Sequence, residues 1–163
     1  MLVDNRDSGA VAVLTMKGKY GLKAMLHLAR LTEGELALSS EIAEAYSISK
    51  KFLDAILREL RISGLILTRK GRAGGYRLSR AAEKITVGEV LRVLDGPIAP
   101  IQCAYRSGYQ PCHDCPDASV CAVRLTMIDV REAIASVLDR RSIADVVAAT
   151  DALAAARPRA GAI

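Results

Sequence analysis

The feature that most constrains the fold is a pair of helical patterns joined by a short turn and followed by a glycine-rich, basic segment. The first pattern is SSEIAEAY, the second is KKFLDAILRELRI, and residues 46–49 form the turn between them. We expect Ser39 or Ser40 to cap the first helix, Ser49 to cap the second and Gly64 to end it. The next segment, LILTRKGRAGGYRLS, is typical of two short strands and a tight turn, because glycine tolerates positive φ angles. Together these elements predict a winged helix-turn-helix.

The rest of the chain predicts a mainly α fold around this unit. An amphipathic helix, MKGKYGLKAMLHLARL, precedes it, and Thr86 is expected to cap a further helix, VGEVLRVLD, that follows it. Apolar residues then recur in alternating steps of four and three, at Val123, Met127, Val130, Ile134 and Val137. This is the spacing of a short coiled-coil seam, so we expect a long dimerisation helix and a homodimer, with core packing of the same stripe as the alternative.

The expected division of the chain has six parts. They are a disordered N-terminal extension (1–15), the winged helix-turn-helix domain (16–80), a connecting helix (81–98), a cysteine-rich sensor loop (99–121), the dimerisation helix with a C-terminal helix (122–150) and a frayed tail (151–163). Ser142 is expected to cap the C-terminal helix. No apolar run approaches the ~20 residues that a membrane-spanning helix needs, so we expect a cytoplasmic protein without a membrane partner.

Positive charge is concentrated in the expected winged domain. Residues 16–80 contain thirteen Lys and Arg against six Asp and Glu, whereas the whole chain carries a net charge of +5. A basic unit of this fold favours double-stranded DNA as the partner, with a solvated basic surface as the alternative. The start of the second helix reads base edges and the hairpin contacts the backbone, so the expected DNA-binding residues are Ser49, Lys50, Lys51, Asp54, Arg58, Arg69, Lys70, Arg72 and Arg77. Among them, Asp54 either accepts a hydrogen bond from cytosine or orients a neighbouring lysine.

All four cysteines lie in one segment, with the spacing Cys103-x8-Cys112-x2-Cys115-x5-Cys121. Clustered cysteines in a cytosolic chain indicate metal or redox chemistry rather than a disulfide framework. We favour an iron–sulfur cluster, of the 2Fe-2S or 4Fe-4S type, with zinc as the alternative metal. The spacing is also compatible with thiol–disulfide switching by Cys112 and Cys115, a C-x-x-C pair, and with four free thiols. An enzyme is not expected, because a thiol oxidoreductase needs a base beside its thiol and the chain has only two histidines.

Four stretches carry a resemblance to a known family: MKGKYGLKAMLHLA, SISKKFLDAILREL, RKGRAGGYRLS and ITVGEVLRVLDGPIAP. Over residues 16–145 the chain resembles the IscR-type (IscR, CymR, NsrR and RirA) family of winged helix-turn-helix transcriptional regulators. The resemblance implies a winged helix on a long dimerisation helix, a sequence-specific DNA operator as partner, and repression as the mode of regulation. One departure is in the wing, where the family usually has Arg before the first glycine and this chain has Lys70, which cannot make a planar bidentate contact to guanine.

The resemblance also bears on the cysteine segment. Cluster-binding members have three cysteines in this loop, which implies Cys103, Cys115 and Cys121 as ligands of a cluster. The fourth ligand is then Cys112, His113 or a group from the partner subunit. CymR, a member without these cysteines, is regulated through a partner protein, so regulation of this chain by a partner protein or a thiol metabolite is the alternative.

Overall fold

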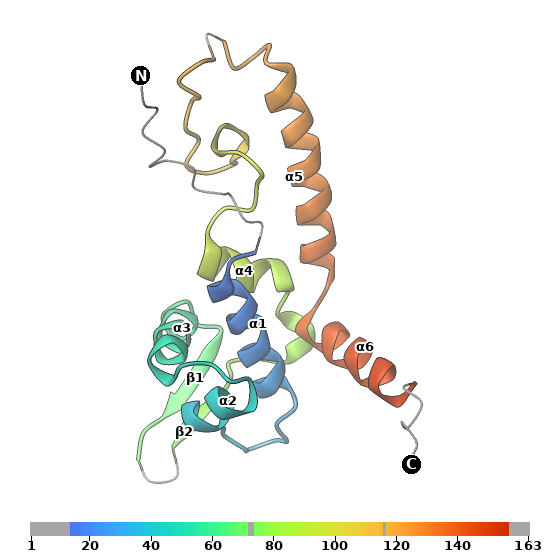
Figure 1. The fold of residues 1–163 in the computed structure, drawn as a ribbon. Coiled ribbons are helices and arrows are strands. Elements are labelled where there is room, and N and C mark those ends of the chain that lie inside the picture. Colours follow the sequence, from blue (N-terminus) through green and yellow to red (C-terminus); the bar gives the residue numbers. More distant parts are fainter. Residues whose placement is uncertain (1–13, 72–73, 116, 157–163) are drawn as a thin grey trace, which may run out of the picture.

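The computed structural model describes residues 14–71, 74–115 and 117–156 and shows a head, from which one long helix projects (Figure 1). Within these residues the elements are α1 (Met16–Ala29), α2 (Ser39–Ala45), α3 (Lys50–Ile62), β1 (Ile66–Arg69), β2 (Gly75–Leu78), the 3-10 turn η1 (Ala82–Lys84), α4 (Val87–Asp95), the 3-10 turn η2 (Gln102–Ala104), α5 (Ala122–Arg140) and α6 (Ile143–Ala155). This is the expected mainly α fold with a small β-hairpin, so the fold class is confirmed.

The core of the head is built on α1, which lies against α3, α4 and α6. The apolar stripe of α3 points into this core, and its members Leu53, Ile56, Leu57 and Leu60 are all fully buried. Since apolar residues three and four positions apart share one face of a helix, the opposite face of α3 is left for solvent.

The hairpin pairs β1 with β2 in antiparallel register, with Ile66 opposite Leu78 and Arg69 opposite Gly75. Ala37, just before α2, extends this pairing, because its N–H and carbonyl exchange hydrogen bonds of 3.0 and 2.9 Å with Tyr76. A Cβ at Gly75 would lie 2.8 Å from the carbonyl oxygen of Ala37, so only glycine fits beside the passing chain. The wing is therefore fixed at its base to the helix-turn-helix.

Most of the expected helix ends are confirmed. The hydroxyls of Ser49, Thr86 and Ser142 each accept a backbone N–H at the start of α3, α4 and α6. Gly64 has a φ of 77° directly after α3, as a left-handed stop requires. The expected cap of α2 at Ser39 or Ser40 is wrong. Leu38 occupies that position, and its N–H donates to the carboxylate of Glu41 at 2.7 Å.

Two of the expected boundaries shift. Thr15 belongs to the folded head and not to the N-terminal extension, because it caps α1 and donates its N–H to Asp95 at 3.0 Å. Helix α6 continues to Ala155 and so includes the first five residues of the expected tail, 151–155. The remaining parts of the extension and the tail, residues 1–13 and 157–163, lie outside the described residues.

Helix α5 forms the arm that projects from the head (Figure 1). It has 19 residues, about 28 Å at 1.5 Å per residue, and none of them is buried. Two backbone hydrogen bonds of 2.8 Å, from Val87 to Arg141 and from Ile143 to Ile85, fix its end to the head. In the described ranges, no helix combines the length and the apolar character that crossing a lipid bilayer demands.

Candidate nucleic-acid interface and cysteine cavity

The turn between α2 and α3 sets the direction of the second helix. Ser47 adopts a positive φ of 51° there, and the side chain of Ile48 is buried beneath the turn. Ser49 then begins α3 with a 3.3 Å hydrogen bond from the Phe52 N–H to its hydroxyl. The start of α3 therefore lies at the surface while its apolar stripe stays in the core.

The expected reading residues of α3 share its solvent-facing side. Ser49, Lys50, Lys51 and Arg58 are exposed, and Asp54 is half-buried. The Asp54 carboxylate pairs with the Lys50 ammonium at 2.7 Å, which is the contact that the second of its two expected roles, orienting a neighbouring lysine, requires. The hydrogen bond from Lys50 is also the main reason that the pKa of Asp54 is lowered.

The wing residues lie at the tip and along one edge of the hairpin. Arg69 ends β1, Lys70 follows it, and Arg77 lies in β2 opposite Leu67, all three exposed. Arg72 lies outside the described residues. Long basic side chains placed like this suit contacts to a phosphate backbone or a narrow minor groove.

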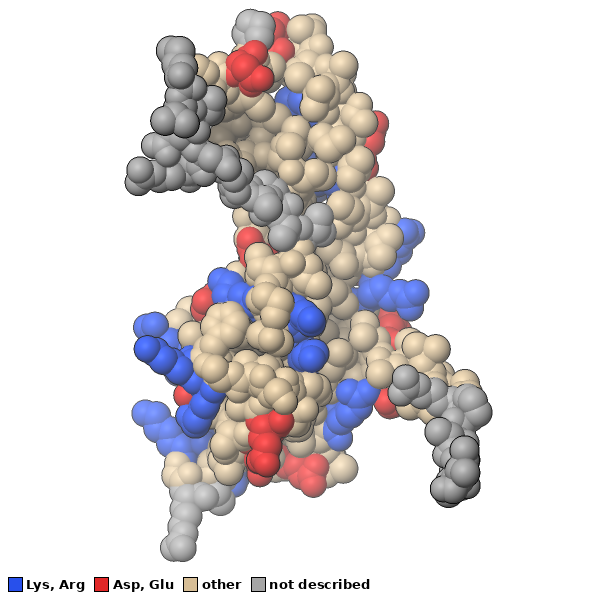
Figure 2. All heavy atoms as spheres, viewed as in Figure 1, with Lys and Arg blue, Asp and Glu red and all other residues tan. Residues whose placement is uncertain are grey.

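Figure 2 shows Lys and Arg side chains gathered on the side of the head where α3 lies. Some cations of the head are instead paired within the chain. Arg80 donates to Glu89 at 2.6 Å, and Lys17 lies 3.1 Å from Glu59. These pairs tie elements of the head together, so the surface for an anionic partner is narrower than the count of basic residues suggests.

The four cysteines line a single cavity of about 390 Å³ at the N-terminal end of α5. All four are free thiols, of which Cys103 is buried and Cys112 exposed. Apolar contacts come from Ile101, Val120 and Val123. The candidate ligand His113 is exposed and is not among the residues that line the cavity.

Among the thiols, Cys112 interacts most strongly with Cys103, and Cys115 with Cys121. Cys115 also interacts with Cys112, the other half of the C-x-x-C pair. The interaction with Cys103 raises the pKa of Cys112, and burial followed by the contact with Cys121 raises the pKa of Cys115.

Cys121 lies at the start of α5, where the helix backbone favours its ionised form. It is the N-cap residue of α5, and backbone N–H groups, chiefly that of Arg124, lower the pKa of its thiol. A helix N-terminus stabilises a thiolate in this way because its free N–H groups point at the sulfur.

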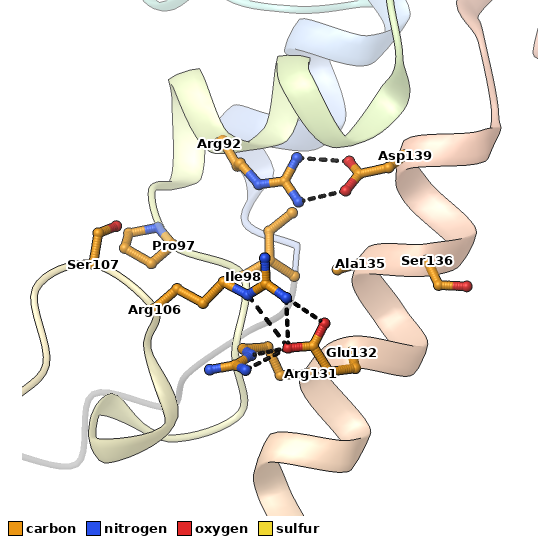
Figure 3. A pocket seen from close by; sticks show the side chains of 10 residues that line it. All are labelled: Arg92, Pro97, Ile98, Arg106, Ser107, Arg131, Glu132, Ala135, Ser136 and Asp139. Atoms are coloured by element: carbon orange, nitrogen blue, oxygen red, sulfur yellow. Dashed lines mark hydrogen bonds and ion pairs between the residues drawn. The ribbon is translucent and has the colours of Figure 1, made fainter.

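Two arginines of α5 hold the cysteine segment against the arm. Arg124 donates to the carbonyl of Cys103 at 2.9 Å, and Arg131 donates to the carbonyl of Ala104 at 2.5 Å. Glu132 in turn accepts hydrogen bonds from Arg131 and from Arg106 of the segment (Figure 3). Sequence reasoning missed this clamp, although the seven-residue spacing of Arg124 and Arg131 does place them on one face of a helix.

A comparison of the sequence with known families leads to the same kind of protein as the fold and the basic helix-turn-helix. The sequence profile of the Rrf2 family, described as iron-dependent transcriptional regulator, matches residues 14–149. The chain belongs to the Rrf2 family.

Individual Rrf2-type relatives cover most of the chain. It is 39% identical over 140 residues to an rrf2-like HTH-type transcriptional regulator of Rhodobacter capsulatus, covering 84% of this chain and 93% of the relative. It is 34% identical over 139 residues to the HTH-type transcriptional regulator CymR of Bacillus subtilis, covering 85% and 91%.

Solved structures of CymR and IscR regulators share the fold of this chain. The structure of CymR, the global cysteine regulator of B. subtilis, has a TM-score of 0.68 at 30% identity and covers 83% of this chain and 95% of its own. IscR of T. potens has a TM-score of 0.66 at 27% identity, with 90% and 92% covered. The resemblance to the IscR-type family is therefore confirmed, and the chain is an Rrf2-family transcriptional regulator.

The cysteine cavity fits a thiolate-bound metal group in number and chemistry. Iron–sulfur clusters and zinc both take cysteine sulfurs as ligands, and four thiols here face one space. Within the described part of the chain, however, no three His, Cys, Asp or Glu side chains are arranged to hold one metal ion. Binding would therefore draw the thiols closer together.

Proposed function

We propose that the protein is a homodimeric, sequence-specific DNA-binding repressor whose affinity depends on the state of its cysteine cavity. The observation that carries the proposal is the division of α3 into a fully buried apolar face and an exposed face of Ser49, Lys50, Lys51 and Arg58. A second helix of this kind enters the major groove with its first residues on base edges. The protein then acts in the cytoplasm as a binding protein and not as an enzyme.

The wing supplies the second part of the interface. Arg69, Lys70, Arg72 and Arg77 would contact phosphates or the adjacent minor groove, and each neutralised phosphate steepens the salt dependence of binding by about 0.9. In the major groove, Lys50 would approach the DNA in a direction limited by its ion pair with Asp54.

Homodimer formation would use the arm. Val123, Val130 and Val137 of α5 are 64%, 38% and 56% exposed, an unusual state for valines at heptad spacing. A second copy of α5 would cover this seam and fix the distance between the two α3 helices, about 34–36 Å for half-sites one DNA turn apart. Burial of these valines then supports both the dimer and the spacing of its reading helices.

Cys103, Cys112, Cys115 and Cys121 would hold an iron–sulfur cluster in the cavity. The four thiols line one cavity and are the ligand type that an iron–sulfur cluster takes, with a single zinc ion as the alternative. Such a cluster would supply redox-sensitive and oxygen-sensitive chemistry. Metal ligation needs the thiolate form, and backbone N–H groups at the start of α5 favour that form at Cys121.

The clamp on α5 gives this cavity a route to the DNA-binding head. Arg124 and Arg131 donate hydrogen bonds to the carbonyls of Cys103 and Ala104. A movement of Cys103 would therefore also shift α5. At its other end α5 is tied to α4 of the head by the Arg92–Asp139 ion pair of 2.6 Å. A change in the cavity would thus alter the angle between arm and head, and with it the operator affinity.

A second candidate regulates the same dimer without metal. The Cys115–Cys121 pair combines a thiolate-favouring helix N-terminus with a neighbouring thiol, which is the arrangement that an oxidant converts to a disulfide. Regulation by a partner protein or a thiol metabolite is the third candidate, and a colourless, iron-free protein that still binds its operator would favour it.

The DNA-binding part is tested by fluorescence anisotropy with a labelled duplex. Lys51→Ala is expected to weaken binding, because one contact to the DNA is lost. If that contact is to a phosphate, the slope of log K against log salt becomes shallower by about 0.9. Arg140→Gln removes the same charge from exposed α5 and serves as the matched control. Equal effects of the two variants would contradict an interface on α3.

A further inference from the structure

A second pocket lies where the head, the cysteine segment and the arm meet, and Figure 3 shows its lining. Its volume is about 270 Å³, just below the ~300–1,000 Å³ of drug-sized ligand sites. Its polar lining consists of Arg92 from α4, Arg106 and Ser107 from the cysteine segment, and Arg131, Glu132, Ser136 and Asp139 from α5. A space of this size suits a molecule of a few carbon atoms.

The charges around the pocket do not balance. Asp139 is matched to Arg92 by two hydrogen bonds of 2.6 and 2.8 Å. The single carboxylate of Glu132 accepts hydrogen bonds from two guanidinium groups, those of Arg106 and Arg131. Hydrogen bonds from arginines lower the pKa of Glu132 and of Asp139, so both carboxylates are ionised at neutral pH and one positive charge stays unmatched.

Arg106 is the guanidinium that can take a new partner. Its side chain is 75% exposed, whereas that of Arg131 is 13% exposed and is also committed to the carbonyl of Ala104. Planar guanidinium groups bind carboxylates through two parallel hydrogen bonds, which Arg106 makes to Glu132 from Nε to Oε1 at 3.3 Å and from Nη2 to Oε2 at 2.9 Å. A competing carboxylate could replace Glu132 without breaking the clamp.

The pocket also offers contacts to a short hydrocarbon. Pro97, Ile98 and Ala135 supply apolar surface beside the three guanidiniums. Glu132 and Val130 are two positions apart and hence about 200° apart around the α5 axis, so the Glu132 carboxylate does not share a face with this valine of the seam.

We propose that this pocket binds a small organic monocarboxylate, whose carboxylate replaces Glu132 on the Arg106 guanidinium. One negative charge balances the lining, the hydrocarbon part contacts Pro97, Ile98 and Ala135, and Ser107 or Ser136 can hydrogen-bond a hydroxyl on the ligand. An occupant would touch α4, the cysteine segment and α5 together. The proposal stands independently of DNA binding and of any metal in the cysteine cavity.

The test is isothermal titration calorimetry of the full chain with lactate, its uncharged analogue lactamide and inorganic phosphate as probes. Lactate is expected to give a saturable binding heat, lactamide none, and phosphate weaker binding because it lacks the hydrocarbon part. The proposal is overturned if lactate gives no binding heat or if phosphate binds as tightly as lactate.

Variants locate the site. Arg106→Gln is expected to weaken lactate binding at least about tenfold, through loss of the bidentate pair. Glu132→Gln is expected to tighten it, since the competing carboxylate is gone, and a misfolded variant would not produce a gain. Arg30→Gln removes an arginine from another ion pair, the 2.7 Å contact with Asp151 on α6, and should change nothing. Unchanged lactate binding in Arg106→Gln, or weaker binding in Glu132→Gln, would refute the assignment.

Discussion

Replacing Asp54 by asparagine should increase the affinity of the protein for DNA of arbitrary sequence. In the structure the Asp54 carboxylate neutralises Lys50, which is the first residue of α3. The substitution keeps the shape of the side chain and removes its charge, so Lys50 becomes free to contact a phosphate. If Asp54 is mainly an acceptor for cytosine, the substitution is expected to weaken operator binding and to leave the affinity for random DNA unchanged.

The size of the effect follows from the exposure of the pair. The side chains of Lys50 and Asp54 are 60% and 41% exposed, so solvent screening limits the ion pair to about 0.3–0.5 kcal/mol of stability. The melting temperature should therefore hardly change. One additional phosphate contact steepens the slope of log K against log salt by about 0.9, which is roughly eightfold in affinity at 0.1 M salt relative to 1 M.

The assay is fluorescence anisotropy with a random duplex over a series of salt concentrations. Asp151→Asn is the matched control, since it removes one negative charge from an exposed ion pair on α6. We expect a steeper slope for Asp54→Asn than for Asp151→Asn. The reasoning is refuted if the two slopes agree, or if Asp54→Asn weakens binding to the random duplex.

Three further changes test the arm and the caps. Val130→Lys should convert the proposed dimer to monomers in analytical ultracentrifugation, because it places a charge in the apolar seam. The control Leu153→Lys on α6 should not. A dimer that survives Val130→Lys excludes this seam. Ser142→Ala should lower the free energy of unfolding by about 1 kcal/mol in a urea titration, since it removes the cap of α6, and an unchanged midpoint would contradict that role. The N–H of Ser142 lowers the pKa of Asp145, so the stabilisation from this carboxylate is complete above its ordinary pKa of 3.8 and is lost as the pH falls through the lowered value. Asp145→Asn should therefore destabilise the protein at neutral pH and have less effect in acid, and a pH-independent difference in melting temperature would contradict this.

Local signals in the sequence are enough to predict the head. Ser49, Thr86 and Ser142 can be identified as caps because a cap depends only on the residue and its next few neighbours. The same holds for Gly64 and for the glycines of the wing, whose φ angles are set by the tight turns that they form. The buried stripe of α3 follows from helical periodicity alone.

The α2 cap fails on a local contact, from Leu38 to Glu41, whereas the other features that the sequence does not predict depend on contacts distant in sequence. Thr15 joins the head through Asp95, which is 80 residues away. In the cysteine segment, Arg124 and Arg131 donate to carbonyls 21 and 27 residues away and so place the segment against α5. Sequence spacing alone does not predict these hydrogen bonds. Periodicity and spacing contain no information on such a loop until α5 is in place.

The central claim, that the cysteine cavity holds the regulatory group, is tested most directly on protein purified without oxygen. The measurement is the visible spectrum together with iron, sulfide and zinc assays of the same sample, for the wild type and for Cys115→Ala. We predict a brown protein with iron and sulfide in equal amounts, and a loss of both colour and iron in Cys115→Ala while the fold is retained. A colourless wild-type protein, whether it contains zinc or no metal, would contradict the claim.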